Sequence, residues 1–128
     1  MITKSQVETR SSIIEQYDDE ILKIARKQGV EMEIEDLDEI ASVYKELLQN
    51  KQPKLLVILD EECNSDMSFM EKMGNSERQL LKKAEALVVS SLGKRLEANF
   101  YIRRYKPNYP VAVFNNEEEG LAWLQSID

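Results

Sequence analysis

Apolar residues recur along the chain in two patterns, one typical of strands and one typical of helices. Short apolar or alternating runs predict strands over residues 7–17, 20–27, 55–60, 86–90 and 111–114. Helical spacing predicts helices over residues 35–49, 92–105 and 117–127, and a further short helix over 76–83. Asp18-Asp19 predicts a hairpin turn between the first two strands. The predicted order is β-β-α-β-α-β-α-β-α.

The alternation of strands and helices predicts one α/β domain over residues 1–128. The runs over 55–60 and 86–90 are apolar throughout, which is typical of strands buried on both faces of a parallel sheet. The N-terminal hairpin is antiparallel, so the sheet has to be mixed. We therefore predict a mixed five-stranded sheet with about four helices. In the last helix, we expect Asn115 at the N-cap, Glu118 at the capping-box position and Trp123 in the core.

Composition restricts the chemistry more than the fold. The chain has no histidine and one cysteine, which excludes Ser-His-Asp and Cys-His catalysis and disfavours structural zinc. Its four glycines lie too far apart to build a P-loop or GxGxxG motif. A net charge of −7 disfavours nucleic acid as a partner. We therefore expect no catalytic residue, metal site, cofactor or nucleic-acid partner.

Localisation is read from the same composition. No apolar run approaches the roughly 18 residues that a transmembrane helix needs, and the N-terminus lacks the apolar core of a secretory signal. A single cysteine agrees with a reducing compartment. The sequence predicts a cytoplasmic protein.

Two serines follow the strand over 86–90 and precede the next helix. A catalytic role for Ser90 or Ser91 is disfavoured, because neither a GxSxG motif nor a histidine is present. Two interpretations stay open. One serine caps the helix, or both bind an anion together with Lys94 and Arg95, because helix N-termini after parallel strands favour negative charge.

A polar row crosses that helix. Arg95, Asn99 and Arg103 recur four residues apart, between one apolar line and another. The first line holds Leu92, Leu96 and Phe100, and the second holds Ala98 and Ile102. The row predicts a polar groove, a subunit interface, or arginines that extend past apolar neighbours to reach solvent. Aromatic residues that suit an interface are Phe100, Tyr101, Tyr105 and Tyr109.

Residues 84–124 combine an apolar strand ending in serines, a helix with Arg and Asn, a KP-x-YP turn and an acidic run before Trp-Leu. Small SpoIIAA-like proteins of the STAS-domain family resemble this segment, and the order of predicted elements resembles a STAS domain over nearly the whole chain. The resemblance implies the SpoIIAA-like fold and a non-enzymatic regulatory or interaction module. Such a module would bind another protein or a second copy of itself as a homodimer.

In antagonist members of that family, a serine beyond the third strand is phosphorylated within an Asp-Ser-Ser-Gly context. Ser68 lies at about the matching distance beyond Asp60 and Ser65 is nearby, but neither has that context. These two serines are the phosphoacceptor candidates that the resemblance implies. A rival hypothesis is a SEC14-like carrier or sensor of a small apolar or anionic ligand held by Arg95 or Arg103. A carboxylate-dependent enzyme is the least favoured hypothesis.

Overall fold

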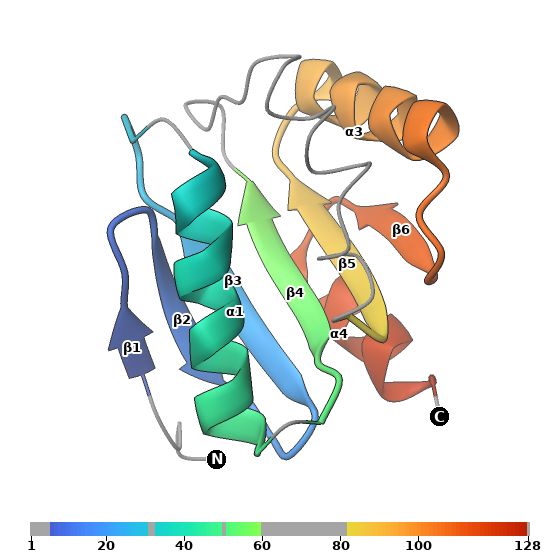
Figure 1. Cartoon of the computed structure of the whole chain (residues 1–128). Coiled ribbons are helices and arrows are strands. Elements are labelled where there is room, and N and C mark those ends of the chain that lie inside the picture. Colours follow the sequence, from blue (N-terminus) through green and yellow to red (C-terminus); the bar gives the residue numbers. More distant parts are fainter. Residues whose placement is uncertain (1–5, 31–32, 50, 60–81, 128) are drawn as a thin grey trace.

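The computed structural model describes residues 6–30, 33–49, 51–59 and 82–127. In this part of the chain, six strands form one sheet in the order β1-β2-β3-β4-β5-β6 (Figure 1). The strands β1 (Gln6–Glu8), β2 (Ser12–Gln16) and β3 (Ile21–Arg26) pair antiparallel. The strands β4 (Lys54–Leu59), β5 (Ala84–Val89) and β6 (Val111–Phe114) continue from β3 in parallel. The mixed α/β class is confirmed.

The predicted count of five strands is wrong, because the run over 7–17 is divided into β1 and β2 by a polar turn. Two hydrogen bonds between Thr9 and Ser12 close this turn. The backbone N–H of Thr9 donates to the Ser12 carbonyl at 2.8 Å, and its Oγ1 accepts from the Ser12 N–H at 3.1 Å. Short hydroxyl side chains compete in this way with a continuous strand ladder. Asp18 forms the predicted second turn, since its Oδ1 accepts from the N–H groups of Glu20 and Ile21.

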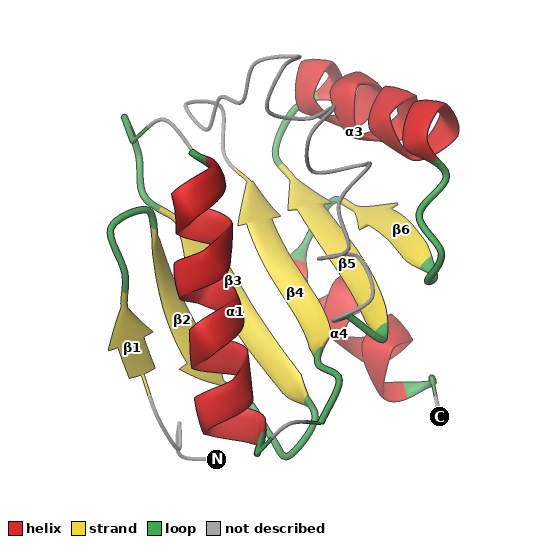
Figure 2. Cartoon of the chain, in the orientation of Figure 1, coloured by secondary structure: helices red, strands yellow, loops and turns green. Residues whose placement is uncertain are grey.

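The described chain has three helices rather than about four (Figure 2). They are α1 (Ile34–Leu48), α3 (Leu92–Tyr105) and α4 (Glu117–Gln125). The short helix predicted over 76–83 lies outside the described residues, except for Lys82 and Lys83, which are not helical. None of the helices in the described ranges combines the length and apolar character needed to cross a membrane.

The sheet is covered on both faces. α1 and α3 lie on one face and α4 lies on the other (Figure 1). Side chains of the central strands alternate between two cores. In β4, Leu55 and Val57 pack toward α1, whereas Leu56 packs with Leu124 of α4. This two-sided burial explains why β4 and β5 read as continuous apolar runs.

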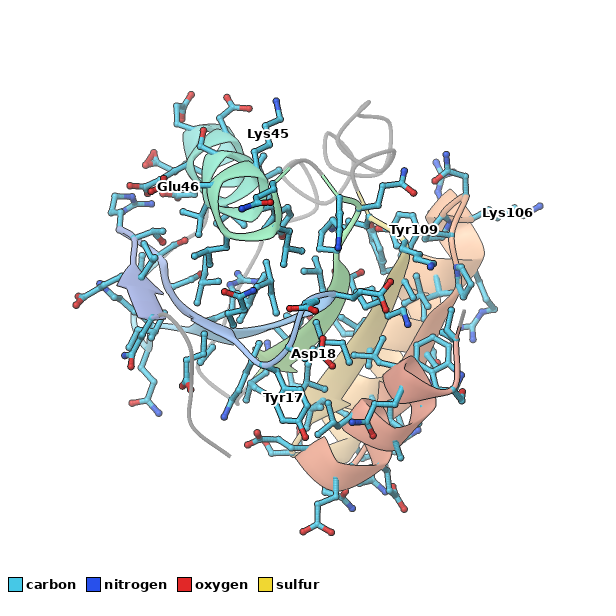
Figure 3. The ribbon with its side chains drawn as sticks, turned by 90° about the horizontal axis from the view of Figure 1, so that it is seen from below. Tyr17, Asp18, Lys45, Glu46, Lys106 and Tyr109 are labelled. Carbon is cyan, nitrogen blue, oxygen red and sulfur yellow. The ribbon has the colours of Figure 1, made fainter. Side chains whose placement is uncertain are left out.

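α1 follows the predicted amphipathic pattern. Ile40, Val43 and Tyr44 are buried against the sheet. On its outer side, Lys45 and Glu46 are exposed and point away from the sheet, as the view from below shows (Figure 3).

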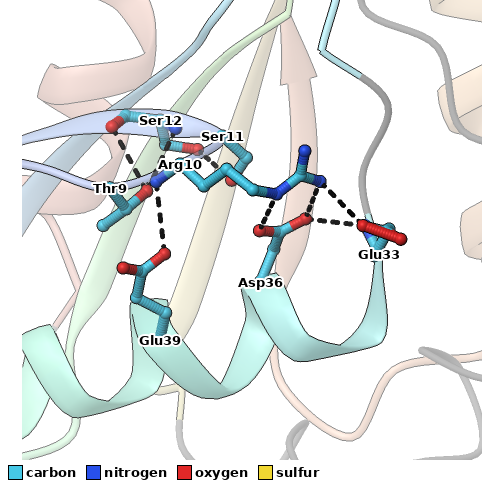
Figure 4. A network of polar contacts seen from close by, with 7 residues as sticks. All are labelled: Thr9, Arg10, Ser11, Ser12, Glu33, Asp36 and Glu39. Atoms are coloured by element: carbon cyan, nitrogen blue, oxygen red, sulfur yellow. Dashed lines mark hydrogen bonds and ion pairs between the residues drawn. The ribbon is translucent and has the colours of Figure 1, made fainter.

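The start of α1 is tied to the turn between β1 and β2 (Figure 4). Arg10 donates from Nε and Nη2 to the two carboxylate oxygens of Asp36, at 2.9 and 2.6 Å. Asp36 also accepts from the Glu33 N–H at 2.8 Å, and Glu39 accepts from the Arg10 N–H at 3.2 Å. The pKa of Asp36 is lowered, above all by its hydrogen bonds from Arg10. These contacts fix the hairpin against the helix.

Candidate functional site

A pocket of about 280 Å³ opens where β5 and β6 end and α3 begins. Its lining residues come from three neighbouring segments: Val89, Ser90, Ser91, Leu92, Arg95 and Asn115. The carboxyl ends of parallel strands are the usual place for ligands in open α/β sheets. For the same reason, the sequence predicts that Ser90, Ser91 and Arg95 lie together, and the structure places all three at this pocket.

Ser91 is the N-cap of α3. Its Oγ accepts from the Lys94 N–H at 3.2 Å, and its backbone is extended, as N-caps require. Ser90 is exposed one residue before the cap. The capping interpretation is therefore confirmed for Ser91, whereas the hydroxyl of Ser90 borders the pocket without that structural role.

Arg95 lies one turn into α3 and is half-buried. Its Nη2 donates to Asn115 Oδ1 at 2.5 Å. Within the described chain, no carboxylate pairs with this guanidinium, so its positive charge is met by a neutral amide. Arg95 therefore brings a cation to a pocket that Ser90 and Ser91 also line, which is suited to an anionic group.

Asn115 was missed as a pocket residue because the sequence placed it at the N-cap of the last helix. The structure places Asn116 there instead, with its Oδ1 accepting from the Glu119 N–H at 2.9 Å. Adjacent asparagines give the same capping signal, so the sequence could not separate them. With Asn116 at the cap, Asn115 is available to Arg95.

The outer side of α3 carries a row of exposed apolar side chains. Leu92 is 71% exposed, Leu96 is 59% exposed and Phe100 is 43% exposed. Among the described residues, the other large hydrophobic side chain with comparable exposure is Tyr17 at 39%. Residues four apart lie on one side of a helix, so these three form one continuous apolar row.

The sheet-facing side of α3 is built from other residues. Lys94, Ala98 and Tyr101 are buried there, and Ala98 belongs to the core that α1 also joins. At about 100° per residue, this side lies nearly opposite Leu96. Of the two predicted apolar lines, the one that holds Ala98 therefore faces the sheet, and the one that holds Leu92, Leu96 and Phe100 faces outward. The polar row of Arg95, Asn99 and Arg103 marks the border between the buried and exposed sides.

The remaining candidates lie away from the pocket lining. The Lys94 ammonium lies 3.7 Å from Glu97 Oε2, Asn99 is half-buried, and Arg103 is exposed. Tyr109 is 8% exposed, and its buried hydroxyl has no hydrogen-bond partner in the described structure. Burial, followed by the Glu85 charge, raises the Tyr109 pKa. Ser65 and Ser68 lie outside the described residues.

Carboxylates elsewhere serve as ion-pair partners. Among the described residues, no group of three or more Cys, Asp or Glu side chains is arranged to hold a metal ion. A hydrogen bond from Lys27 lowers the pKa of Glu8, as Arg10 does for Asp36. A general acid at neutral pH needs the opposite, a raised carboxyl pKa. These two groups therefore act as structural anions.

Comparison with known proteins gives one match. A family model described as a domain of unknown function, DUF7793, matches residues 15–128. Neither the curated proteins nor the solved structures contain a match to the chain. The matched region begins within β2 and includes the rest of the sheet, the pocket and α3. The chain therefore belongs to the DUF7793 family of domains of unknown function.

Proposed function

We propose that this chain is a non-enzymatic STAS-like interaction module that binds another protein through the outer side of α3. The observation that carries the proposal is the row of Leu92, Leu96 and Phe100, which are exposed together on one helix. Folding gains nothing from apolar side chains that stay in water, whereas a partner that covers them removes apolar surface from water. In protein interfaces, a few well-covered side chains carry most of the binding energy.

Two further observations support a regulatory module of this kind. In the described residues, antiparallel strands come first and parallel strands with the helices α1 and α3 follow, which is similar to the element order that the STAS resemblance implies. The full sequence also contains no histidine, the base most often used in acid–base catalysis.

The test compares variants of the tagged full chain purified from its own cells and analysed by native mass spectrometry. The wild-type chain should retain a protein partner, and Leu96→Ser combined with Phe100→Ser should lose it. Tyr17→Ser is the matched control, because Tyr17 is a large exposed apolar side chain that lies outside α3. Circular dichroism verifies that each variant is folded. Equal retention of the partner by the double variant, or no partner at all, would refute the proposal.

A second candidate function rests on the pocket. Its volume of about 280 Å³ lies near the lower end for small-molecule sites, and Arg95 supplies one polar anchor. This is the arrangement expected of a carrier or sensor of a small anion. The same mass spectra distinguish it, because a carrier should show a non-protein adduct that disappears in Arg95→Gln.

A further inference from the structure

We infer that the segment docking on α3 is acidic as well as apolar: its apolar side chains cover Leu92, Leu96 and Phe100, and one of its carboxylates enters the pocket to reach the Arg95 guanidinium. The inference rests on the proposed function and specifies the chemistry of the partner.

The pocket and the apolar row are continuous. Leu92 belongs to both, since it begins the exposed row and also lines the pocket. A chain that covers Leu96 and Leu92 therefore arrives at the pocket mouth within one helical turn. One bound segment can use both features together.

The charge of the surface selects the partner. Arg95 bonds a neutral amide and has no carboxylate partner in the described structure. Arg103 is exposed two turns further along the same polar row. Two guanidinium groups therefore lie along one side of the apolar row, while the whole chain carries a net charge of −7. A carboxylate brought to Arg95 forms a charge-assisted hydrogen bond, which is stronger than the bond that Arg95 makes with a neutral amide.

A second copy of this chain is a poorer fit. Its own α3 would bring the same arginines to the contact. Its other exposed large apolar side chain in the described structure is Tyr17, whose acidic neighbours are already engaged. Asp18 accepts from two backbone N–H groups, and Glu20 lies 3.6 Å from the Lys54 ammonium. Three exposed side chains also fall short of the roughly 20–30 residues that each side of a stable interface contributes. A short acidic segment suits this surface better.

The test uses two synthetic amphipathic peptides with identical leucine faces. One carries glutamates along its flanks and the other carries glutamines at the same positions. Each is titrated against the full chain by isothermal calorimetry at low salt. We expect the glutamate peptide to bind about tenfold more tightly, because one charge-assisted hydrogen bond is worth roughly that factor.

Variants of the chain test which residues produce the preference for the glutamate peptide. Arg95→Gln should abolish the preference while leaving the affinity of the glutamine peptide unchanged, and Arg95→Lys should restore part of it. Leu96→Ser should weaken both peptides by about tenfold. Arg103→Gln, at an exposed position outside the pocket lining, should reduce the preference by less than Arg95→Gln does. Circular dichroism again verifies folding.

Several results would overturn the inference. Equal binding of the two peptides, binding of neither, or an unchanged preference in Arg95→Gln would each do so. Inorganic phosphate that binds through Arg95 when the peptides do not would instead favour a small-anion site. Sedimentation showing dimers that Leu96→Ser abolishes would favour a second copy. If the preference fails but the partner in cells is still lost on mutating α3, the protein-binding function stands and only the acidic chemistry is wrong.

Discussion

α1 and α3 both connect parallel strands on the same face of the sheet, yet they use their apolar residues in opposite ways. α1 buries Ile40, Val43 and Tyr44 and leaves charged side chains outside. α3 exposes Leu92 and its row and buries Lys94. α1 is therefore explained by folding alone. α3 carries apolar residues that its own packing does not use, and the proposed contact surface rests on this excess.

The largest expected effect contrasts the two helices directly. Ile40→Ala should lower the free energy of unfolding by about 2–4 kcal/mol, because it leaves a cavity in the core beneath α1. Leu96→Ala should change it by less than about 0.5 kcal/mol, since this side chain is already in water. Urea unfolding followed by circular dichroism measures both. Similar losses in the two variants would show that the α3 row is covered within the folded chain.

The same contrast shows what a sequence can predict. α1 has one apolar stripe, so its position and its buried side were both predictable. α3 has an apolar line on each side of its polar row, and periodicity alone cannot decide which line faces the sheet. The helix itself, Leu92–Tyr105, was predicted with the bounds that it has. Its orientation depends on Ala98 and Tyr101 packing inside, which is a tertiary effect.

Local hydrogen bonds account for the other differences. The extra strand arises because Thr9 and Ser12 bond each other across a turn inside an otherwise strand-like run. At the pocket, Ser90, Ser91 and Arg95 were predicted from the strand-to-helix crossing. Asn115 could be found only once Asn116 was known to hold the cap.

A smaller effect is expected at the start of α1, which the Arg10–Asp36 contacts hold. Asp36→Asn should lower the free energy of unfolding at pH 7 by about 1–2 kcal/mol, because the two hydrogen bonds from Arg10 lose their charged, buried acceptor. The exposed side of Arg10 keeps this loss below that of a fully buried pair. Glu46→Gln, on the outer side of the same helix, is the control and should change stability little.

The difference in the free energy of unfolding between the wild type and Asp36→Asn should decrease at low pH. The folded state lowers the Asp36 pKa below its ordinary value of 3.8, so the unfolded chain binds the proton more readily. The stabilisation is therefore complete above that value and is lost as the pH falls through the lower pKa of the folded state. Urea unfolding of the wild type and of Asp36→Asn from pH 7 to pH 2.5 should give free energies of unfolding that converge below about pH 4. A constant difference would mean that the carboxylate charge is not what Asp36 contributes.

A single N-cap hydrogen bond from Ser91 stabilises the start of α3, whereas several contacts with Asp36 stabilise the start of α1. The expected loss of stability on mutation is therefore smaller at α3. Ser91→Ala should lower the free energy of unfolding by about 1 kcal/mol, the usual value of an N-cap hydroxyl. Ser90→Ala, one residue earlier, should leave stability within about 0.5 kcal/mol of the wild type. Thermal unfolding of the pair tests this. A larger loss in Ser90→Ala than in Ser91→Ala would mean that Ser90, and not Ser91, caps the helix.

The smallest effect on stability is expected at the C-caps, where α1 and α3 share the same left-handed backbone conformation. Gln49 is the C-cap of α1 with a φ of 53°, and Lys106 is the C-cap of α3 with a φ of 44°. A side chain in this left-handed region costs about 1–2 kcal/mol, which glycine avoids, although glycine also makes the unfolded chain more flexible. Gln49→Gly and Lys106→Gly should therefore each raise the free energy of unfolding by about 0.5 kcal/mol. Lys45→Gly, inside the last turn of α1, is the control and should lower it by about 1 kcal/mol. A gain at Gln49 without one at Lys106 would mean that Lys106 does not adopt this left-handed conformation in solution. The position of Arg103, in the last turn of α3, would then differ from its position in this structure.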